Sequence, residues 1–396
     1  MAKKVSSMFF SPARFFALSC SILGAACSSP AGNDGSEILV PYEQLGGNIA
    51  FSTFAISGSN GYDLYIVPVP DLSANPVLAP LRITDTPGNE WQPTVARNGG
   101  GMAFVKDGNI HVITSSGRIR QISDNDGNGL IDSLPSVSAD ARSVAWVRED
   151  STRPIGDTGF FETYIMLADF DGSNIREVAP ENGIIQDTPT FDPAPGSKRL
   201  AWSEFDANSL LGANGPSIYG IRIFDYLNTT SSYPCRAENG QTPGIEMLPV
   251  RDSLPSYRCF GQHLTWATND VLVLSQDMLE ISLSKSSLDS VWSSVIQGVQ
   301  QQQTGIPDIA ANQFGFFPRF PLSASYAADT SVMVFDGYIS EIDGNNPTLA
   351  IYIAPPTGNV PQRLKIAGYT TDIDTTNTAD YLFSVATPTI IPFFIP

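Results

Sequence analysis

Short apolar runs separated by polar turns follow one another along most of this chain. The clearest set begins in Leu134–Asn174 and runs on to Val178, and its alternation predicts four short antiparallel strands joined by tight turns. These strands are a Pro-led run from Leu134, then Ser143–Val147, Thr163–Ala168 and Ile175–Val178. A four-stranded sheet of this size is too small to be stable alone, so it needs similar neighbours.

The same order of runs recurs on both sides of that stretch. A Pro-containing polar run precedes an apolar run ending in Ala-Phe, Ala-Trp or a similar pair, and further strands follow. Copies begin near Gln92, Thr188, His263 and Phe317, with shorter runs at Gly47–Ser52 and Asp380–Ser384. A unit of about forty to sixty residues built from four strands is typical of a β-propeller.

Two segments carry a more specific likeness. Thr188–Ser203 and Leu167–Val178 (which includes Asp-Gly-Ser-Asn) resemble the WD40-like β-propeller repeat of the TolB family. The resemblance implies a propeller and, in that family, docking of an envelope lipoprotein. This chain lacks the separate N-terminal domain of that family, so the partner itself is not transferred.

The fold class predicted is therefore all-β, a single propeller of six or seven four-stranded blades over residues 38–396. Seven is favoured, because seven runs of the Ala-Phe or Ala-Trp type can be counted. Insertions are expected at about 228–261 and 283–316, and helical spacing over Ser287–Gln303 predicts one inserted helix. The apolar end Thr389–Pro396 is expected to complete a blade with the N-terminal strand and so close the ring.

Residues 1–26 have the pattern of an export signal. Basic residues are followed by the apolar run Phe15–Ala26, which is too short to span a bilayer. Leu23–Cys27 resembles a bacterial lipobox, with Gly24 where leucine is usual, which implies acylation of Cys27; conventional cleavage is the alternative. Residues 27–37 form a flexible tether. The expected location is the periplasm or outer membrane, with membrane contact only through this anchor.

Two cysteines remain beyond the signal region. Cys235 and Cys259 are 24 residues apart, and in an oxidising compartment they are expected to form a disulfide that staples a Pro- and Gly-rich loop. No C-x-x-C spacing indicates a redox or metal site.

The charge balance excludes one class of partner. The chain has 22 Lys and Arg against 40 Asp and Glu, a formal net charge of −18. Such a surface repels phosphate backbones, so nucleic acid is not an expected partner. It suits cations, a basic partner, or solubility alone.

One local motif suggests a metal. Residues 124–132 place Asp124, Asp126, Asn128 and Asp132 as in a calcium loop, with Leu130 offering its carbonyl. Pro135 stands where the loop usually has a bidentate glutamate, and strands flank it, so the loop is incomplete. A turn without an ion is the alternative, because Asp, Asn and Gly favour turns. Structural calcium is the only cofactor predicted.

No catalytic constellation stands out. Both histidines, His111 and His263, lie in predicted strands, where a structural role is the default, and no G-x-S-x-G or H-E-x-x-H motif occurs. The leading hypothesis is an exported, non-enzymatic propeller that binds a macromolecular envelope partner, expected to be a protein, through loops on one face. The alternatives are a periplasmic glycosidase or lyase using acidic residues in the central channel, and a purely structural envelope protein. The sequence does not indicate an oligomeric state.

Overall fold

The chain folds almost entirely as β-structure. In the computed structural model, the described residues are 37–53, 61–71, 73–74, 76–125, 128–156, 160–181, 183–206, 218–238, 264–268, 271–274, 279–282, 321–329, 331–337, 350–354, 362–368 and 388–392. Within these ranges, the one helical element is a single 3-10 turn, η1 (Tyr42–Gln44). None of the described residues forms a helix with the length and apolar character needed to cross a bilayer.

The N-terminal half forms three four-stranded antiparallel sheets, called blades 1 to 3. Blade 1 has the order β25-β1-β2-β4, blade 2 is β5-β6-β7-β8, and blade 3 is β9-β10-β11-β12. Their bounds are β25 Thr389–Ile390, β1 Asn48–Thr53, β2 Asp63–Pro68, β4 Leu81–Arg82, β5 Glu90–Val95, β6 Gly101–Lys106, β7 Asn109–Thr114, β8 Ile119–Gln121, β9 Leu130–Val137, β10 Ser143–Pro154, β11 Phe161–Asp169 and β12 Arg176–Val178.

The C-terminal half contributes two more four-stranded sheets and one with three strands. Blade 4 is β13-β14-β15-β16, the three-stranded sheet is β17-β18-β19, and blade 5 is β20-β21-β22-β23. Their bounds are β13 Ile184–Phe191, β14 Arg199–Asp206, β15 Ile218–Asp225, β16 Thr230–Glu238, β17 Leu264–Thr268, β18 Val271–Leu274, β19 Leu279–Ser282, β20 Pro321–Tyr326, β21 Met333–Gly337, β22 Ala350–Ala354 and β23 Gln362–Arg363.

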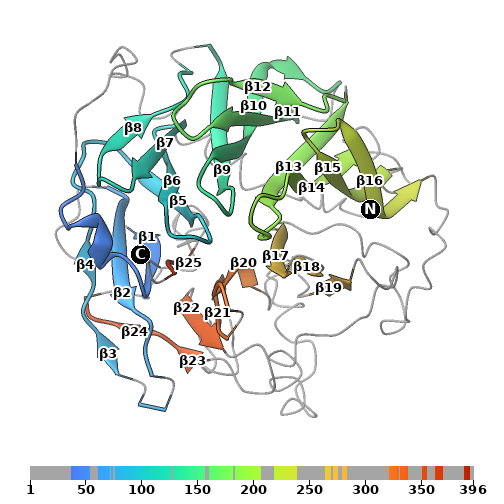
Figure 1. The fold of residues 1–396 in the computed structure, drawn as a ribbon. Helices are drawn as coiled ribbons and strands as arrows, with labels where there is room; N and C mark the ends of the chain where they lie inside the picture. The colour runs from blue at the N-terminus through green and yellow to red at the C-terminus, as the bar shows by residue number, and fades with distance from the viewer. Residues whose placement is uncertain are drawn as a thin grey trace, which may run out of the picture.

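The sheets stand around a common centre with one strand of each innermost (Figure 1). This propeller-like arrangement confirms the all-β prediction, but the described residues form five four-stranded blades, not six or seven. The run near His263 makes only the three-stranded sheet, and the C-terminal strand joins β1 instead of a blade of its own. The expected strand at Asp380–Ser384 and the expected helix at Ser287–Gln303 lie outside the described residues. Part of the expected insertion at 228–261 is the regular outer strand β16.

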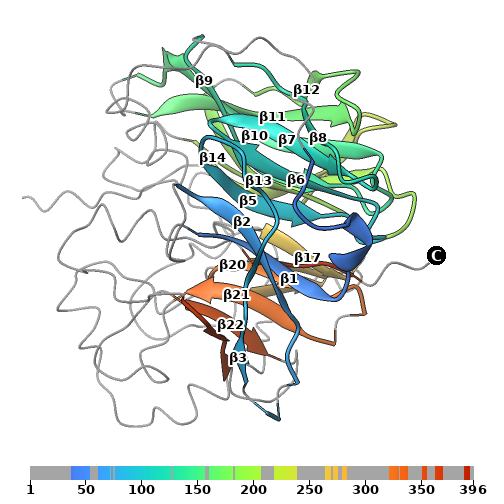
Figure 2. The ribbon, with the colours of Figure 1, turned by 90° about the vertical axis from the view of Figure 1, so that its left-hand side faces the viewer.

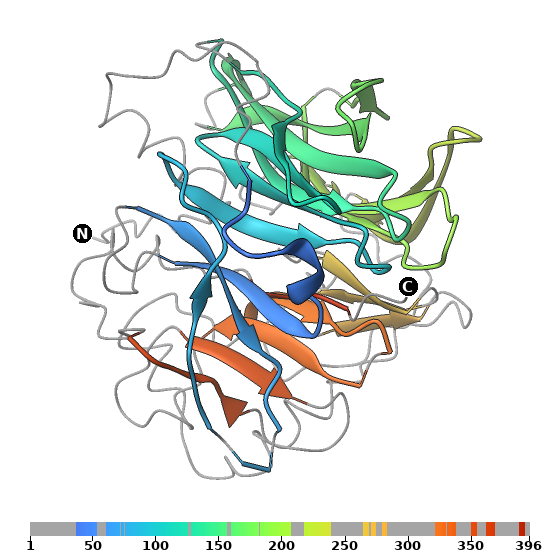
Figure 3. The same ribbon diagram turned by 60° about the vertical axis from the view of Figure 1, so that its left-hand side comes forward.

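The first strand and the last described strand of the chain meet in one sheet, as predicted. Strand β25 pairs antiparallel with β1, with Ile390 opposite Ile49. A second link is the parallel pair of β3 (Val77–Leu78) and β24 (Lys365–Ile366), which joins the segment between β2 and β4 of blade 1 to the segment after β23 of blade 5. Figures 2 and 3 show β1 and β2 lying between the strands of blade 2 and those of blade 5.

Strand periodicity explains how the blades pack. Successive side chains of a strand point to opposite faces of the sheet. In β10, Val144 and Trp146 pack into the cluster shared with blade 2, whereas Ala145 and Val147 pack into the cluster shared with blade 4. Both faces of the sheet are therefore buried here, which is why Val144–Val147 of β10 is apolar at every position.

Trp146 offers a test of this packing. It is fully buried between blades 2 and 3, and its indole N–H has no hydrogen-bond acceptor. We expect Trp146→Ala to lower the free energy of unfolding by about 3–5 kcal/mol through the cavity it leaves. Trp146→Phe should change it by less than about 1 kcal/mol, because losing an unsatisfied donor offsets the lost contact area. Urea denaturation of both variants gives the values, and a Phe variant as unstable as the Ala variant would contradict the explanation.

Candidate functional site

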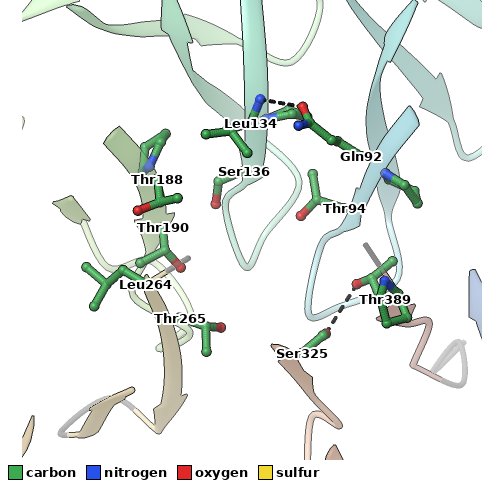
Figure 4. A pocket seen from close by; sticks show the side chains of 14 residues that line it. Gln92, Thr94, Leu134, Ser136, Thr188, Thr190, Leu264, Thr265, Ser325 and Thr389 are labelled. Carbon is green, nitrogen blue, oxygen red and sulfur yellow. Dashed lines mark hydrogen bonds between the residues drawn. The ribbon is translucent and has the colours of Figure 1, made fainter. Parts of the chain in front are cut away.

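A pocket of about 150 Å³ lies where the innermost strands converge. Its lining comes from the five blades and the three-stranded sheet, and each of these six contributes at least one Ser or Thr. Figure 4 shows hydroxyl oxygens of several of these residues directed toward the space between the strands. The six residues, called here the hydroxyl ring, are Thr94, Ser136, Thr190, Thr265, Ser325 and Thr389.

A repeated bulge brings these side chains to the channel in blades 2 to 4. In each innermost strand, two residues stand opposite a single aromatic residue of the next strand. The three pairs are Gln92-Pro93 opposite Phe104, Leu134-Pro135 opposite Trp146, and Thr188-Pro189 opposite Trp202. The residue of the hydroxyl ring follows the proline each time.

The first residue of each bulge has a left-handed backbone. The φ angles are 53° at Gln92, 51° at Leu134 and 48° at Thr188, a region that costs energy for residues other than glycine. Proline at the next position needs no ladder hydrogen bond, which fits an innermost edge. Three blades thus repeat the same strained geometry at the same place, and it faces the pocket.

Hydrogen bonds tie neighbouring innermost strands together around the pocket. The Leu134 N–H donates to Gln92 Oε1 at 2.8 Å, and the Phe191 N–H donates to Ser136 Oγ at 3.2 Å. The Ser325 and Thr389 hydroxyls lie 3.3 Å apart (Figure 4). Since each of these bonds joins two sheets, the pocket wall is held by inter-blade contacts.

One side chain crosses the channel at the end where β5 turns into β6. Arg97 Nη2 donates to the Trp266 carbonyl at 3.1 Å, and Nη1 donates to the Ala328 carbonyl at 3.1 Å. Neither β17 nor β20 neighbours β5 in the ring, so the guanidinium reaches across to the far side. Burial lowers the pKa of Arg97, and the nearby Asp192 and Asp329 oppose this; arginine stays charged in any case.

The pocket itself is uncharged. None of the described residues that line it has a titratable side chain. A carboxyl group lies directly behind the wall, because Asp187 precedes Thr188 and is buried, with the Thr188 N–H donating to Oδ1 at 2.8 Å. Burial raises the pKa of Asp187 to about 6, and burial raises that of Glu90, at the start of β5, to about 6 as well.

The predicted calcium ligands are only partly gathered. Asp124 and Asn128 are exposed, Leu130 begins β9, and Asp126 lies outside the described residues. Asp132 is fully buried and its two carboxylate oxygens accept hydrogen bonds of 2.8 Å from Arg148, whose guanidinium also donates to Asn125 Oδ1 at 2.9 Å. No group of three or more His, Cys, Asp or Glu side chains suited to a metal occurs within the described ranges. Calcium binding stays a prediction.

The remaining sequence-predicted residues are placed as follows. His111 is buried in β7 with its ring 5.5 Å from that of Phe104, as expected for a structural imidazole. Cys235 lies in β16 opposite Ile221. His263, Cys259 and Cys27 fall outside the described residues, so the disulfide and the acylation are untested.

Sequence reasoning missed the hydroxyl ring. Single Ser and Thr residues in strands form no catalytic motif, and each can be read as an ordinary strand residue. The usable signal was the recurrence of Pro followed by Thr or Ser at one position of the repeat. It occurs at Pro93-Thr94, Pro135-Ser136, Pro189-Thr190 and Pro388-Thr389.

The buried carboxyl group of Asp187 predicts how the free energy of unfolding depends on pH. Its folded pKa lies above the usual value of 3.8, so protonation favours the folded state, and this contribution is lost as pH rises from about 4 through 6. Asp187→Asn keeps an oxygen acceptor for the Thr188 N–H and removes the buried charge. We expect it to raise the free energy of unfolding at about pH 7 by up to roughly 3 kcal/mol, with little effect at about pH 4.

Urea denaturation of both proteins across this pH range measures the difference. A variant less stable than wild type at neutral pH would contradict the assignment. Thr190→Val, on the same strand but without a titratable group, should leave the shape of the pH profile unchanged.

Comparison with known proteins places the fold. No family model and no curated protein matches the chain. Among solved structures, TolB from Acinetobacter baumannii has a TM-score of 0.50 at 14% identity, over 87% of this chain and 67% of that one. A TolB-type structure from Agrobacterium tumefaciens (TM-score 0.34, 16% identity, 50% and 64% covered) and puromycin hydrolase (0.42, 12%, 88% and 49%) are also similar. This chain thus spans about two thirds of the TolB structures, with which it shares the β-propeller fold.

Proposed function

We propose that this chain is an exported β-propeller that binds a macromolecular partner at the cell envelope, without catalysis, at the mouth of its central channel. The observation that carries the proposal is the lining of that channel, a fixed ring of neutral hydrogen-bonding groups with no titratable side chain among its described residues. General acid catalysis, general base catalysis and activation of a nucleophile all need titratable side chains. Rigid strands that present polar atoms but no titratable side chains are suited to binding a partner.

Export and envelope location rest on the sequence. The basic and then apolar segment 1–26 and the lipobox-like Leu23–Cys27 support secretion with acylation at Cys27. The TolB-like fold agrees with an envelope location, and a Cys235–Cys259 disulfide would suit an oxidising compartment.

The mouth opposite Arg97 is the side we assign to the partner. At the Arg97 end, the guanidinium bonded to the Trp266 and Ala328 carbonyls lies across the ring. At the other end the innermost strands begin, with Glu90 of β5 and Ile184 of β13 among their first residues. A partner that enters from there meets the hydroxyl ring before it meets Arg97.

The enzyme alternative makes a different demand on the same channel. A glycosidase or lyase of the expected kind needs carboxylates that converge on one pocket. The buried carboxylate of Asp187, which precedes the lining residue Thr188, is not among the described lining residues and accepts the Thr188 N–H. The described lining therefore favours the binding proposal over this alternative.

Partner capture with a filled channel tests the proposal. The mature wild-type chain and the variants Thr94→Trp and Thr190→Trp, which fill the channel from different blades, are immobilised and exposed to envelope extract. Thr114→Trp, on β7 outside the pocket, is the matched control. We expect one stoichiometric partner to bind wild type and Thr114→Trp but neither filled variant, with all four proteins folded by circular dichroism. Equal capture by all four proteins, or turnover of envelope glycans by wild type, would overturn the proposal.

We also propose that the loop 124–132 binds calcium in competition with Arg148. The guanidinium holds both oxygens of Asp132, so a cation that uses Asp132 must displace it. Millimolar calcium should raise the melting temperature of wild type modestly and that of Arg148→Gln more, relative to each protein in chelator. Asp140→Asn, in a turn outside this loop, should respond as wild type does. No shift in either wild type or Arg148→Gln would remove the calcium proposal.

A further inference from the structure

Three threonine hydroxyls of the ring are available to a ligand. Within the described residues, those of Thr94, Thr190 and Thr265 make no hydrogen bond, and all three residues are half-buried. Ser136 Oγ accepts the Phe191 N–H, which leaves its proton to donate elsewhere. A hydroxyl both donates and accepts, so the ring offers both kinds of partner from several directions (Figure 4).

The charge of the site restricts the ligand. No side chain of the described lining is charged, so none of them could neutralise an ion brought into the pocket, and a buried charge without a counter-ion is costly. The formal net charge of −18 adds long-range repulsion of anions. A neutral ligand rich in hydrogen-bonding groups is therefore favoured over a charged one.

The backbone of the channel disfavours an extended peptide. A peptide that adds to a sheet edge needs unpaired N–H and C=O groups in register. Pro93, Pro135 and Pro189 remove the N–H at the innermost edge of three blades, and the bulges interrupt the register there. The proline rings and the side chains of Leu134 and Leu264 instead present C–H surfaces between the hydroxyls.

The volume of the pocket limits the size of the ligand. A pocket of about 150 Å³ is smaller than the roughly 300–1,000 Å³ of sites that enclose whole drug-sized ligands. We infer that the channel binds one uncharged sugar residue, a neutral pyranoside at the end of a larger glycan, through the hydroxyl ring. The sugar hydroxyls pair with the ring, and its C–H face contacts the prolines. This inference rests on the proposed function, because it names the part of the partner that enters the channel.

The test uses simple pyranosides as probes. Methyl glucoside and methyl galactoside, with glucuronate as the charged counterpart, are titrated into the mature chain and followed by saturation-transfer NMR and calorimetry. At least one neutral glycoside should bind with millimolar affinity and glucuronate should bind far more weakly. Thr190→Val and Thr265→Val should each weaken binding about two- to tenfold, the effect of one neutral hydrogen bond. Thr114→Val, outside the channel, should bind as wild type does.

Three results would overturn the inference. They are no neutral glycoside bound at tens of millimolar, glucuronate bound as well as the neutral sugars, or affinity unchanged in both valine variants. If one of these results is found while Thr190→Trp still blocks partner capture, only the sugar inference is wrong and the docking proposal stands. If neutral glycosides do not bind and Thr190→Trp does not block partner capture, both the sugar inference and the docking proposal are wrong.

Discussion

Closure of the ring is the constraint on which the structure depends. The apolar runs of the central strands β6 and β10 are buried on both faces, and each face needs a neighbouring sheet to cover it. An open row of such sheets would leave two apolar faces in water at its ends. The pairing of β25 with β1 removes those ends, and the cluster that contains Phe51 of blade 1 and Val334 of blade 5 fills the joint.

The repeated bulges connect this packing to the channel. Phe104, Trp146 and Trp202 are fully buried between blades, and each stands opposite the two bulged residues of the innermost strand. The aromatic side chain anchors the second strand, while the extra residue on the first strand turns its neighbours toward the axis. Each bulge thus positions one buried aromatic residue and one residue that lines the channel, so the lining repeats from blade to blade as the core residues do.

Much of the fold could be predicted because it depends on local pattern. The four strands of Leu134–Asn174 form one sheet, and the C-terminal residues close the ring, both as the alternation of apolar and polar runs implies. Blade number could not be predicted by counting apolar runs, since a run such as Val271–Leu274 does not reveal how many strands will join it. The site was hidden for a related reason. Arg148 and Asp132, or Arg97 and the Trp266 carbonyl, meet only through strand pairing and ring closure, and no spacing in the sequence encodes such contacts.

The position of β25 also bears on how the protein matures. Its residues, Thr389 and Ile390, come after every other described strand in the chain, yet they take the innermost place in the first sheet. Earlier blades can assemble as the polypeptide emerges, since domains and their parts begin to fold from the N-terminal side during synthesis. The circle cannot be completed until synthesis has passed Ile390. Of the described blades, the first is therefore the last to gain its final strand, and removal of the segment from Thr389 onward would leave the ring open.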